Sequence, residues 1–182
     1  MNTLTRATSK QPVTLVEDAR ASGRIPNPLD FTIRLGIVSD SEELSKFWGP
    51  ARRFSQLRLL RRYFEEVEQD VQAVHVAEYA DRYVGQFWTR YKGIDPAIAD
   101  SDTECYLHTL FVPKPYRRRG IARALTEAAS EEARLRGRRT LIIGVDRPNE
   151  YALSLYEKWG FAEFYESSDL RGDLIFLRRD VF

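Results

Sequence analysis

The 182-residue chain is poor in the residues that build disulfide frameworks and zinc sites. Its one cysteine, Cys105, excludes an internal disulfide. The two histidines, His75 and His108, do not have the spacing of zinc ligands, so we expect no metal. No apolar run approaches the ~18–20 residues of a membrane span, and the N-terminus has no signal-peptide core. We therefore expect a cytoplasmic protein without membrane contact.

An excess of charge of one sign is also absent. The chain has 28 Lys+Arg and 27 Asp+Glu, a net charge of +1. Any anion binding must therefore come from a local patch. Basic residues cluster between Arg52 and Arg62, which would suit nucleic acid, but acids follow at once between Glu65 and Asp70. That alternation favours a solvated helix face, and we expect no nucleic-acid partner.

The remaining composition is that of one globular domain. Apolar residues make up 43% of the chain and aromatic residues 12%, enough for a sizeable core. Residues 1–29 are rich in Ser, Thr, Pro and Gly and show no sustained hydrophobic period. We interpret them as a flexible leader or surface arm. Residues 30–182 form the domain.

Hydrophobic periodicity predicts seven strands and four helices. The expected strands are Phe31–Val38, Gln72–Tyr79, Tyr83–Tyr91, Glu104–Val112, Leu141–Val145, 161–166 and 173–179. The expected helices are a short one from Asp40, then 52–70, Arg119–Arg136 and Asn149–Trp159. The order β-α-α-β-β-β-α-β-α-β-β mixes a hairpin with crossover units. It predicts an α/β domain with one mixed sheet.

One segment carries a chemical signal, the strand–turn–helix junction from Val112 to Arg123. A helix that starts here has four unpaired backbone N–H groups and a positive dipole end, which attract phosphate oxygens. Gly120 and Ala122 leave room for a pyrophosphate to approach the backbone. A Walker loop would need Gly-Lys-Ser/Thr, and a dinucleotide fingerprint would need a third Gly near Leu125. The segment fits neither and predicts an anion site only.

The segment around this junction resembles the GNAT acyl-CoA N-acyltransferases. Their phosphate loop reads Gln/Arg-x-x-Gly-x-Gly/Ala, and residues 117–122 read Arg-Arg-Arg-Gly-Ile-Ala. Leu-Phe-Val precedes this loop at 110–112, and a second block follows with Asn149, Tyr156 and Gly160-Phe161. The resemblance covers about residues 31–179. It implies a GNAT-like fold and acetyl-CoA as co-substrate.

The resemblance also implies which residues bind acetyl-CoA. Backbone groups of the strand before the loop would pair with the pantetheine arm, and N–H groups of the loop would cradle the pyrophosphate. The implied cofactor-binding residues are Leu110, Phe111, Val112, Arg117, Arg118, Arg119, Gly120, Ile121, Ala122, Arg123, Asn149 and Tyr156. Two of them have structural alternatives: Asn149 could simply cap the next helix, and Tyr156 could be core packing.

The resemblance implies a catalytic acid and a position for the base. Tyr156 would protonate the leaving thiolate. A base would help the amine, because deprotonating a lysine-like amine at pH 7 costs ~4–5 kcal/mol. His108 stands where serotonin N-acetyltransferases carry a catalytic His and polyamine acetyltransferases a Glu, and it is our first candidate, with Glu104 second. A histidine hydrogen-bonded within the sheet is the structural alternative.

Other positions depart from related patterns. Tyr106 replaces the Glu of histone acetyltransferases, and Gly144 the Glu of ribosomal-protein alanine acetyltransferases. Cys105 should face away from His108, because neighbouring residues of a strand point to opposite faces. An acyl-cysteine intermediate is therefore not expected.

These features predict transfer of an acetyl group from acetyl-CoA to a primary amine by direct attack. The acceptor, a small molecule or a protein amine, cannot be read from the residues. The alternative is a non-catalytic acyl-CoA-binding sensor or scaffold. A homodimer formed through the apolar final segment from Leu174 is a further expectation.

Overall fold

The predicted order of elements is confirmed. The computed structural model describes residues 29–48, 53–169 and 172–181. Its strands are β1 (Thr32–Leu35), β2 (Gln72–Tyr79), β3 (Arg82–Arg90), β4 (Glu104–Phe111), β5 (Thr140–Asp146), β6 (Ala162–Asp169) and β7 (Gly172–Asp180). The α-helices are α2 (Ser41–Ser45), α3 (Arg53–Glu68), α4 (Ile121–Leu135) and α5 (Glu150–Lys158), with 3-10 turns η1 (Val38–Asp40), η2 (Lys46–Trp48) and η4 (Lys114–Tyr116). Residues 1–28 of the predicted leader lie outside the described residues.

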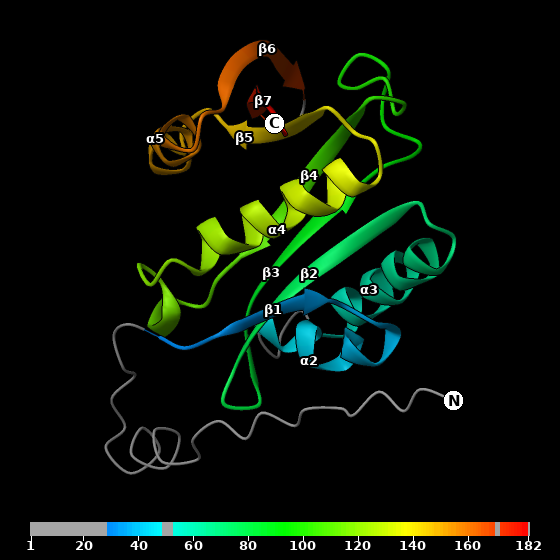
Figure 1. Cartoon of the computed structure of the whole chain (residues 1–182), viewed down its shortest axis with the longest axis vertical. Helices are drawn as coiled ribbons and strands as arrows, with labels where there is room; N and C mark the ends of the chain where they lie inside the picture. Colours follow the sequence, from blue (N-terminus) through cyan, green and yellow to red (C-terminus); the bar gives the residue numbers. More distant parts are fainter. Residues whose placement is uncertain (1–28, 49–52, 170–171, 182) are drawn as a thin grey trace, which may run out of the picture.

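The seven strands form one mixed sheet in the order β1-β2-β3-β4-β5-β7-β6. The β4–β5 pair is parallel, and the other neighbours run antiparallel. Figure 1 shows α4 lying across the strands, α2 and α3 beside β1 and β2, and α5 next to β5. Helices thus cover the sheet on both sides, as the sequence predicts for an α/β domain.

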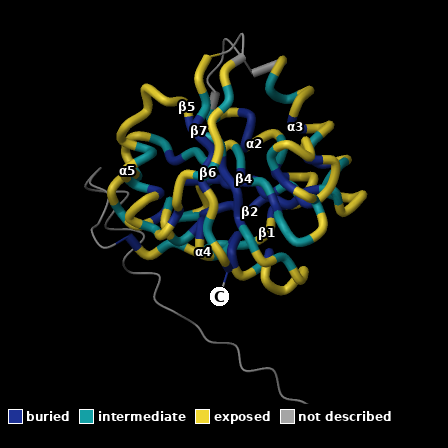
Figure 2. Tube along the Cα trace, turned by 90° about the horizontal axis from the view of Figure 1, so that it is seen from above, coloured by how far each residue is buried: buried dark blue, intermediate teal, exposed yellow. Residues whose placement is uncertain are grey.

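The larger core lies between the sheet and α4. Apolar residues at helical spacing on α4, from Ile121 through Leu125 to Ala133, pack on Phe87 and Leu107 of the central strands. Leu29, the last residue of the predicted leader, is only 6% exposed and belongs to the same cluster. Figure 2 shows that buried residues run along the strands while the outer helices carry the exposed ones.

The opposite face of the sheet has two smaller cores. Leu60 and Phe64 of α3 pack on Val74 and Trp88. Farther along the sheet, Ile142 and the neighbouring strand β7 are covered by the loop between β3 and β4 rather than by a helix. This face is therefore covered unevenly, with aromatic side chains between the two cores.

Most predicted boundaries are off by one to three residues, and two of these differences have a clear cause. Strand β1 ends at Leu35 instead of Val38, because the side chain of Asp40 accepts a hydrogen bond from the backbone N–H of Ile37 and turns the chain into η1. Helix α4 begins at Ile121 instead of Arg119, because its N-cap Gly120 has a left-handed conformation (φ +84°). Both differences come from turns that hydrophobic periodicity does not detect.

Asp40 is the centre of a buried hydrogen-bond network that joins β1, η1 and β3. Its carboxylate is 3% exposed and accepts hydrogen bonds from Arg34 Nη1 (2.8 Å), Arg34 Nη2 (2.9 Å), Ile37 N (2.8 Å) and Tyr83 Oη. Burial alone would raise the pKa of Asp40, but the hydrogen bonds from Arg34, Tyr83 and Ile37 outweigh it and lower the pKa.

We expect Asp40→Asn to lower the free energy of unfolding by about 2 kcal/mol, since an amide cannot accept both guanidinium hydrogen bonds and Arg34 keeps only its ion pair with Glu78. The control is Asp70→Asn: that side chain is 60% exposed, so the change should stay within about 0.5 kcal/mol. The folded pKa of Asp40 lies below its ordinary value of ~3.9, so the stabilisation is present above that pH and lost below it. Urea unfolding at several pH values measures both effects, and equal losses in the two variants would contradict this assignment.

The described sheet edges bear on the predicted homodimer. Strand β7, which contains most of the apolar final segment, is hydrogen-bonded to β5 on one side and to β6 on the other. In the described residues its edges are thus occupied, so a dimer in which β7 pairs edge to edge with its partner would require an exchange of strands. The homodimer stays a prediction.

Candidate active site

The central feature of the site is the place where two parallel strands, β4 and β5, separate, which we call the fork. Strands β4 and β5 pair from Glu104–Thr140 to Leu107–Ile143, but β4 runs on to Phe111 and β5 to Asp146. Beyond the last pair, their facing backbone edges border a cleft of about 750 Å³. Such unpaired edges offer N–H and C=O groups to an extended ligand.

Leu110, Phe111 and Val112 lie along the β4 side of this cleft, as predicted. A bulge precedes them: Gln86 and Trp88 of β3 pair with Phe111 and His108, so β4 contains one more residue than β3 over this stretch. The extra residue changes which side chains face the cleft.

The N-terminus of α4 closes one end of the cleft. Its N-cap, Gly120, has no side chain that could accept hydrogen bonds from the first N–H groups of the helix. The first turn contains no Asp or Glu. A Cβ added at Gly120 would have no heavy atom within 4 Å, so the space above the helix end is open. Gly120, Ile121, Ala122 and Arg123 all line the cleft. This arrangement suits an anionic ligand.

The four arginines of the loop have different roles. Arg117 lines the cleft, but its Nε donates to Val112 O (2.8 Å), which fastens the loop to the end of β4. Arg118 and Arg123 are exposed and line the cleft, so their charge faces the opening. Arg119 does not line the cleft, and its Nε donates to Pro115 O (3.4 Å). Of the predicted cofactor-binding residues, Arg119 alone does not line the cleft.

Asn149 has the structural role that was one of its two predicted alternatives. Its Oδ1 accepts a hydrogen bond from Ala152 N (3.2 Å) and caps α5. It also lines the cleft.

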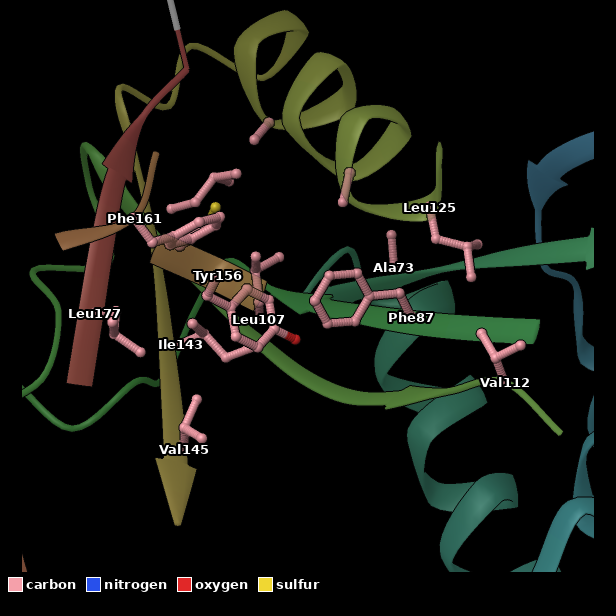
Figure 3. Close-up of a cluster of buried hydrophobic side chains, with 14 of the residues drawn as sticks. Ala73, Phe87, Leu107, Val112, Leu125, Ile143, Val145, Tyr156, Phe161 and Leu177 are labelled. Atoms are coloured by element: carbon pink, nitrogen blue, oxygen red, sulfur yellow. The ribbon is translucent and has the colours of Figure 1, made fainter. Parts of the chain in front are cut away.

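Tyr156 projects from α5 to the base of the fork. Figure 3 shows it in the cluster that contains Leu107 and Ile143, the last paired residues of the two strands. Its ring makes edge contacts with Trp159 (5.5 Å between centroids) and Phe161 (5.4 Å). Burial, with a smaller effect of Tyr106, raises the pKa of Tyr156 above that of a free phenol. The hydroxyl therefore keeps its proton at neutral pH.

His108 lies on the opposite side of the cleft, on β4. Its Nδ1 lies 3.0 Å from Thr109 Oγ1, and its Nε2 lies 3.1 Å from Gln72 Oε1. Burial, assisted by the positive charge of Arg90, lowers the pKa of His108 to about 4. The ring is therefore neutral at pH 7 and has one nitrogen with a free electron pair.

Comparison with known proteins agrees with this geometry. Residues 41–161 match the acetyltransferase (GNAT) family. The chain belongs to this family. Two curated relatives are each 36% identical to it: N-alpha-acetyltransferase 30 of Schizosaccharomyces pombe over 59 residues, and the ribosomal protein bS18-alanine N-acetyltransferase of Escherichia coli over 80 residues. These alignments cover 32% and 41% of this chain and 39% and 54% of the relatives, so the chain spans about half of their length or less.

The fold is likewise that of the family. A putative acetyltransferase from Salmonella typhimurium, solved with its cofactor acetyl-CoA, superposes with a TM-score of 0.66 at 16% identity, covering 84% of this chain and 94% of that one. At this identity the likeness concerns the fold alone.

The structure does not place Glu104, the second candidate base, in the active site of this GNAT protein. Its Oε2 accepts a hydrogen bond from Asp100 N (3.0 Å), and it does not line the cleft. Glu104 and His108 share a face of β4, as predicted, but four residues of strand separate them by about 13 Å. Sharing a face therefore does not bring Glu104 to the fork, and it is not retained as a base. Cys105 is buried on the face opposite His108, in the core under α4.

Among the cleft residues that sequence reasoning did not propose for the site are Thr109 and Asp146. Asp146 is an exposed acid at the end of β5, two residues beyond Gly144 and therefore on the same face. Gly144 itself has little room for a side chain, because a Cβ would lie 3.0 Å from Tyr106 Oη and 3.1 Å from Phe176 Cε1. Asp146 could have been found from this alternation along β5, whereas nothing in the sequence indicated Thr109.

Neither a metal centre nor a membrane segment is found in the parts of the chain that the structure describes. Over residues 29–48, 53–169 and 172–181, no three His, Cys, Asp or Glu side chains are grouped so that they could hold a metal ion. No helix within the same ranges is long and apolar enough to cross a membrane.

Proposed function

We propose that the protein is an acetyl-CoA-dependent N-acetyltransferase that acts on a primary amine by direct attack. The observation that carries this proposal is the fork itself. It combines two open strand edges, a helix N-terminus without a cap, and a protonated tyrosine at its base. Members of the GNAT family use acetyl-CoA. The long polar arm of this ligand suits the open strand edges, and its pyrophosphate suits the N-terminus of the helix.

The residues of the cleft divide the binding of acetyl-CoA between them. Backbone N–H groups of Ile121, Ala122 and Arg123 would hold the pyrophosphate at the end of α4, where the helix dipole favours negative charge. Arg118 and Arg123 would add positive charge. The open edge of β4 from Leu110 to Val112 would pair with the amide groups of the pantetheine arm. Bound there, acetyl-CoA supplies the activated acyl group as a thioester.

Tyr156 is the proposed general acid. Because burial raises its pKa, the phenol holds a proton at Oη over the working pH range. It can give that proton to a sulfur that becomes negatively charged as the acyl group leaves. Holding the two reactants in one cleft supplies much of the remaining rate through proximity.

His108 is the proposed base, but its pKa differs from that of an ordinary histidine. With a histidine of ordinary pKa as the base, activity would rise with pH around pH 6.5. Since the pKa of His108 is lowered to about 4, we expect this rise near pH 4 instead. Above that pH, activity should rise only as the acceptor amine loses its own proton.

The acceptor is proposed to be a primary amine of a protein or of a small molecule. The curated relatives support the protein alternative, because one is named for acetylation of an alanine of ribosomal protein bS18 and the other is named an N-alpha-acetyltransferase. Tyr106 and His108 of β4 line the cleft together with Gly144 and Asp146 of β5. Asp146 gives the cleft a carboxylate that would attract a protonated amine.

The test is acetyl-CoA turnover against a panel of alkylamines, polyamines, aminoglycosides and peptides with free α-amines, with intact-mass detection of products. We expect product with at least one class of amine. A chain that binds acetyl-CoA but acetylates no amine in the panel would favour the sensor or scaffold alternative. A chain that does not bind acetyl-CoA would contradict both.

A further inference from the structure

A chain of hydrogen bonds connects the cleft with the interior through His108. From the cleft side it runs from Thr109 Oγ1 to His108 Nδ1 (3.0 Å), and from His108 Nε2 to Gln72 Oε1 (3.1 Å). The Gln72 amide nitrogen then donates to Glu66 Oε2 (2.9 Å) and to Tyr63 O (3.2 Å). Arg90 Nη1 donates to the same Glu66 oxygen (2.8 Å). The chain thus joins β4, β2, α3 and β3.

The partners of Gln72 determine the direction of these hydrogen bonds. A carboxylate and a carbonyl are acceptors only, so the NH₂ group of Gln72 must face Glu66 and Tyr63 O. If the amide were flipped, Gln72 Oε1 would face Glu66 Oε2 and Tyr63 O, and none of the three could donate a hydrogen bond. Gln72 Oε1 therefore faces His108 and accepts, which requires a proton on His108 Nε2. The other nitrogen, Nδ1, is then an acceptor, and the Thr109 hydroxyl donates to it.

Thr109 is held in an unusual backbone conformation at the cleft end of this chain. It is the bulge residue of β4, with φ +56°. For a β-branched residue this left-handed conformation is a true outlier, and strain of this kind is concentrated at functional sites. Thr109 is exposed and lines the cleft, while its hydroxyl is hydrogen-bonded to His108. The bulge therefore presents the hydroxyl to the cleft and to the imidazole together.

We propose that the Thr109 hydroxyl relays a proton from the acceptor amine to His108 Nδ1, and that Gln72 is the positioning residue that keeps Nδ1 unprotonated. This inference rests on the proposed acetyl transfer. As the amine lone pair forms the C–N bond and the C–S bond breaks, the nitrogen gives a proton to Thr109 Oγ1, whose own proton moves to His108 Nδ1. The electron pair of the N–H bond stays on nitrogen, and the sulfur takes a proton from Tyr156.

The charges around His108 are consistent with this role. Arg90 of β3 opposes a positive imidazole, while Glu66 of α3 is engaged by Arg90 and Gln72. The rings of Tyr63 and Tyr106 pack at 5.5 Å and 6.2 Å from the imidazole. With its pKa lowered to about 4, His108 cannot hold the proton of a free alkylammonium. It can accept the more acidic proton of a nitrogen that has already bonded to the acyl carbon.

The first test is ¹⁵N NMR of the two histidine rings at pH 7. His75→Gln assigns the signals, because the chain has only two histidines. We expect His108 to show a protonated Nε2 and an unprotonated Nδ1. In Gln72→Leu, the two nitrogens should shift toward each other as the tautomers mix. A proton on Nδ1 in the unmodified protein would overturn the proposal.

The second test compares Thr109→Val with Thr109→Ser, using single turnover of acetyl-CoA with an alanine-starting peptide and with the best amine of the panel. Valine keeps the branched shape without the hydroxyl, so the rate should fall by about 10²-fold, whereas serine should retain it within about fivefold. Affinity for acetyl-CoA should be unchanged in both. The matched control is Thr32→Val on the exposed face of β1, which should leave the rate unchanged.

An undiminished rate in Thr109→Val would overturn the relay. Failure of the proposed function looks different: the unmodified protein would acetylate neither acceptor, while the ring-nitrogen signals would still report a proton on Nε2. That result overturns the transferase and, with it, the relay.

Discussion

Replacing Gly120 with glutamate is expected to abolish acetyl-CoA binding. The substitution puts a carboxylate over the open N-terminus of α4, where the pyrophosphate would bind, so repulsion and bulk act together. In the unmodified protein, acetyl-CoA at 100 times Kd should raise the free energy of unfolding by about 2.7 kcal/mol, and in Gly120→Glu this gain should disappear. Calorimetry should show an increase in Kd of more than about 100-fold, equal to a loss of about 2.7 kcal/mol.

Gly137→Glu is the matched control for this substitution. Gly137 also has a positive φ, +75°, and a Cβ there would meet nothing within 4 Å. It follows the other end of α4 and does not line the cleft. Each variant should lose about 1–2 kcal/mol of stability from backbone strain, but only Gly120→Glu should lose binding. Unchanged affinity in Gly120→Glu would remove the helix end from the site.

Replacing Tyr156 with phenylalanine is expected to lower kcat by about 10²-fold with little change in affinity for acetyl-CoA. The ring contacts with Trp159 and Phe161 remain, and only the proton at Oη is lost. Single-turnover rates measure this directly, because slow product release could mask part of the effect in steady state.

Tyr91→Phe provides the control for Tyr156→Phe. Tyr91 is 1% exposed, and burial also raises its pKa. It does not line the cleft, so losing its hydroxyl should leave turnover unchanged. A full single-turnover rate in Tyr156→Phe would return Tyr156 to the alternative of core packing.

Local sequence signals predicted much of the architecture and the helix end that borders the cleft. Strand β2 was predicted at its observed bounds, Gln72–Tyr79, because alternation and the turn that follows are both local. Gly120 was found because a helix start with small residues is a local signal. Predicted ends failed where a side chain or a left-handed residue sets a turn, as at Asp40 and Gly120.

Strand alternation gave a correct face and an incorrect position for Glu104. It places residues 104, 106 and 108 on one side of β4 but does not say where β5 leaves β4. Only residues beyond Leu107 border the cleft as an open edge, so His108 lies at the fork and Glu104 lies beside a paired stretch. Whether a residue of β4 lies at the fork depends on its pairing with β5, whose residues are 36 positions farther along the chain.

The sequence by itself determined the order of the elements and the start of the helix after Gly120, because both depend on residues close together in the chain, and the mixed sheet followed from that order. The tertiary structure decided the fork, the bulge at Thr109 and the hydrogen bonds of His108. Gln72 and His108 are 36 residues apart, and Thr109 takes its conformation from the register between β3 and β4. Such features depend on which distant strands pair and in what register, and this follows from burial of the whole core rather than from local propensity.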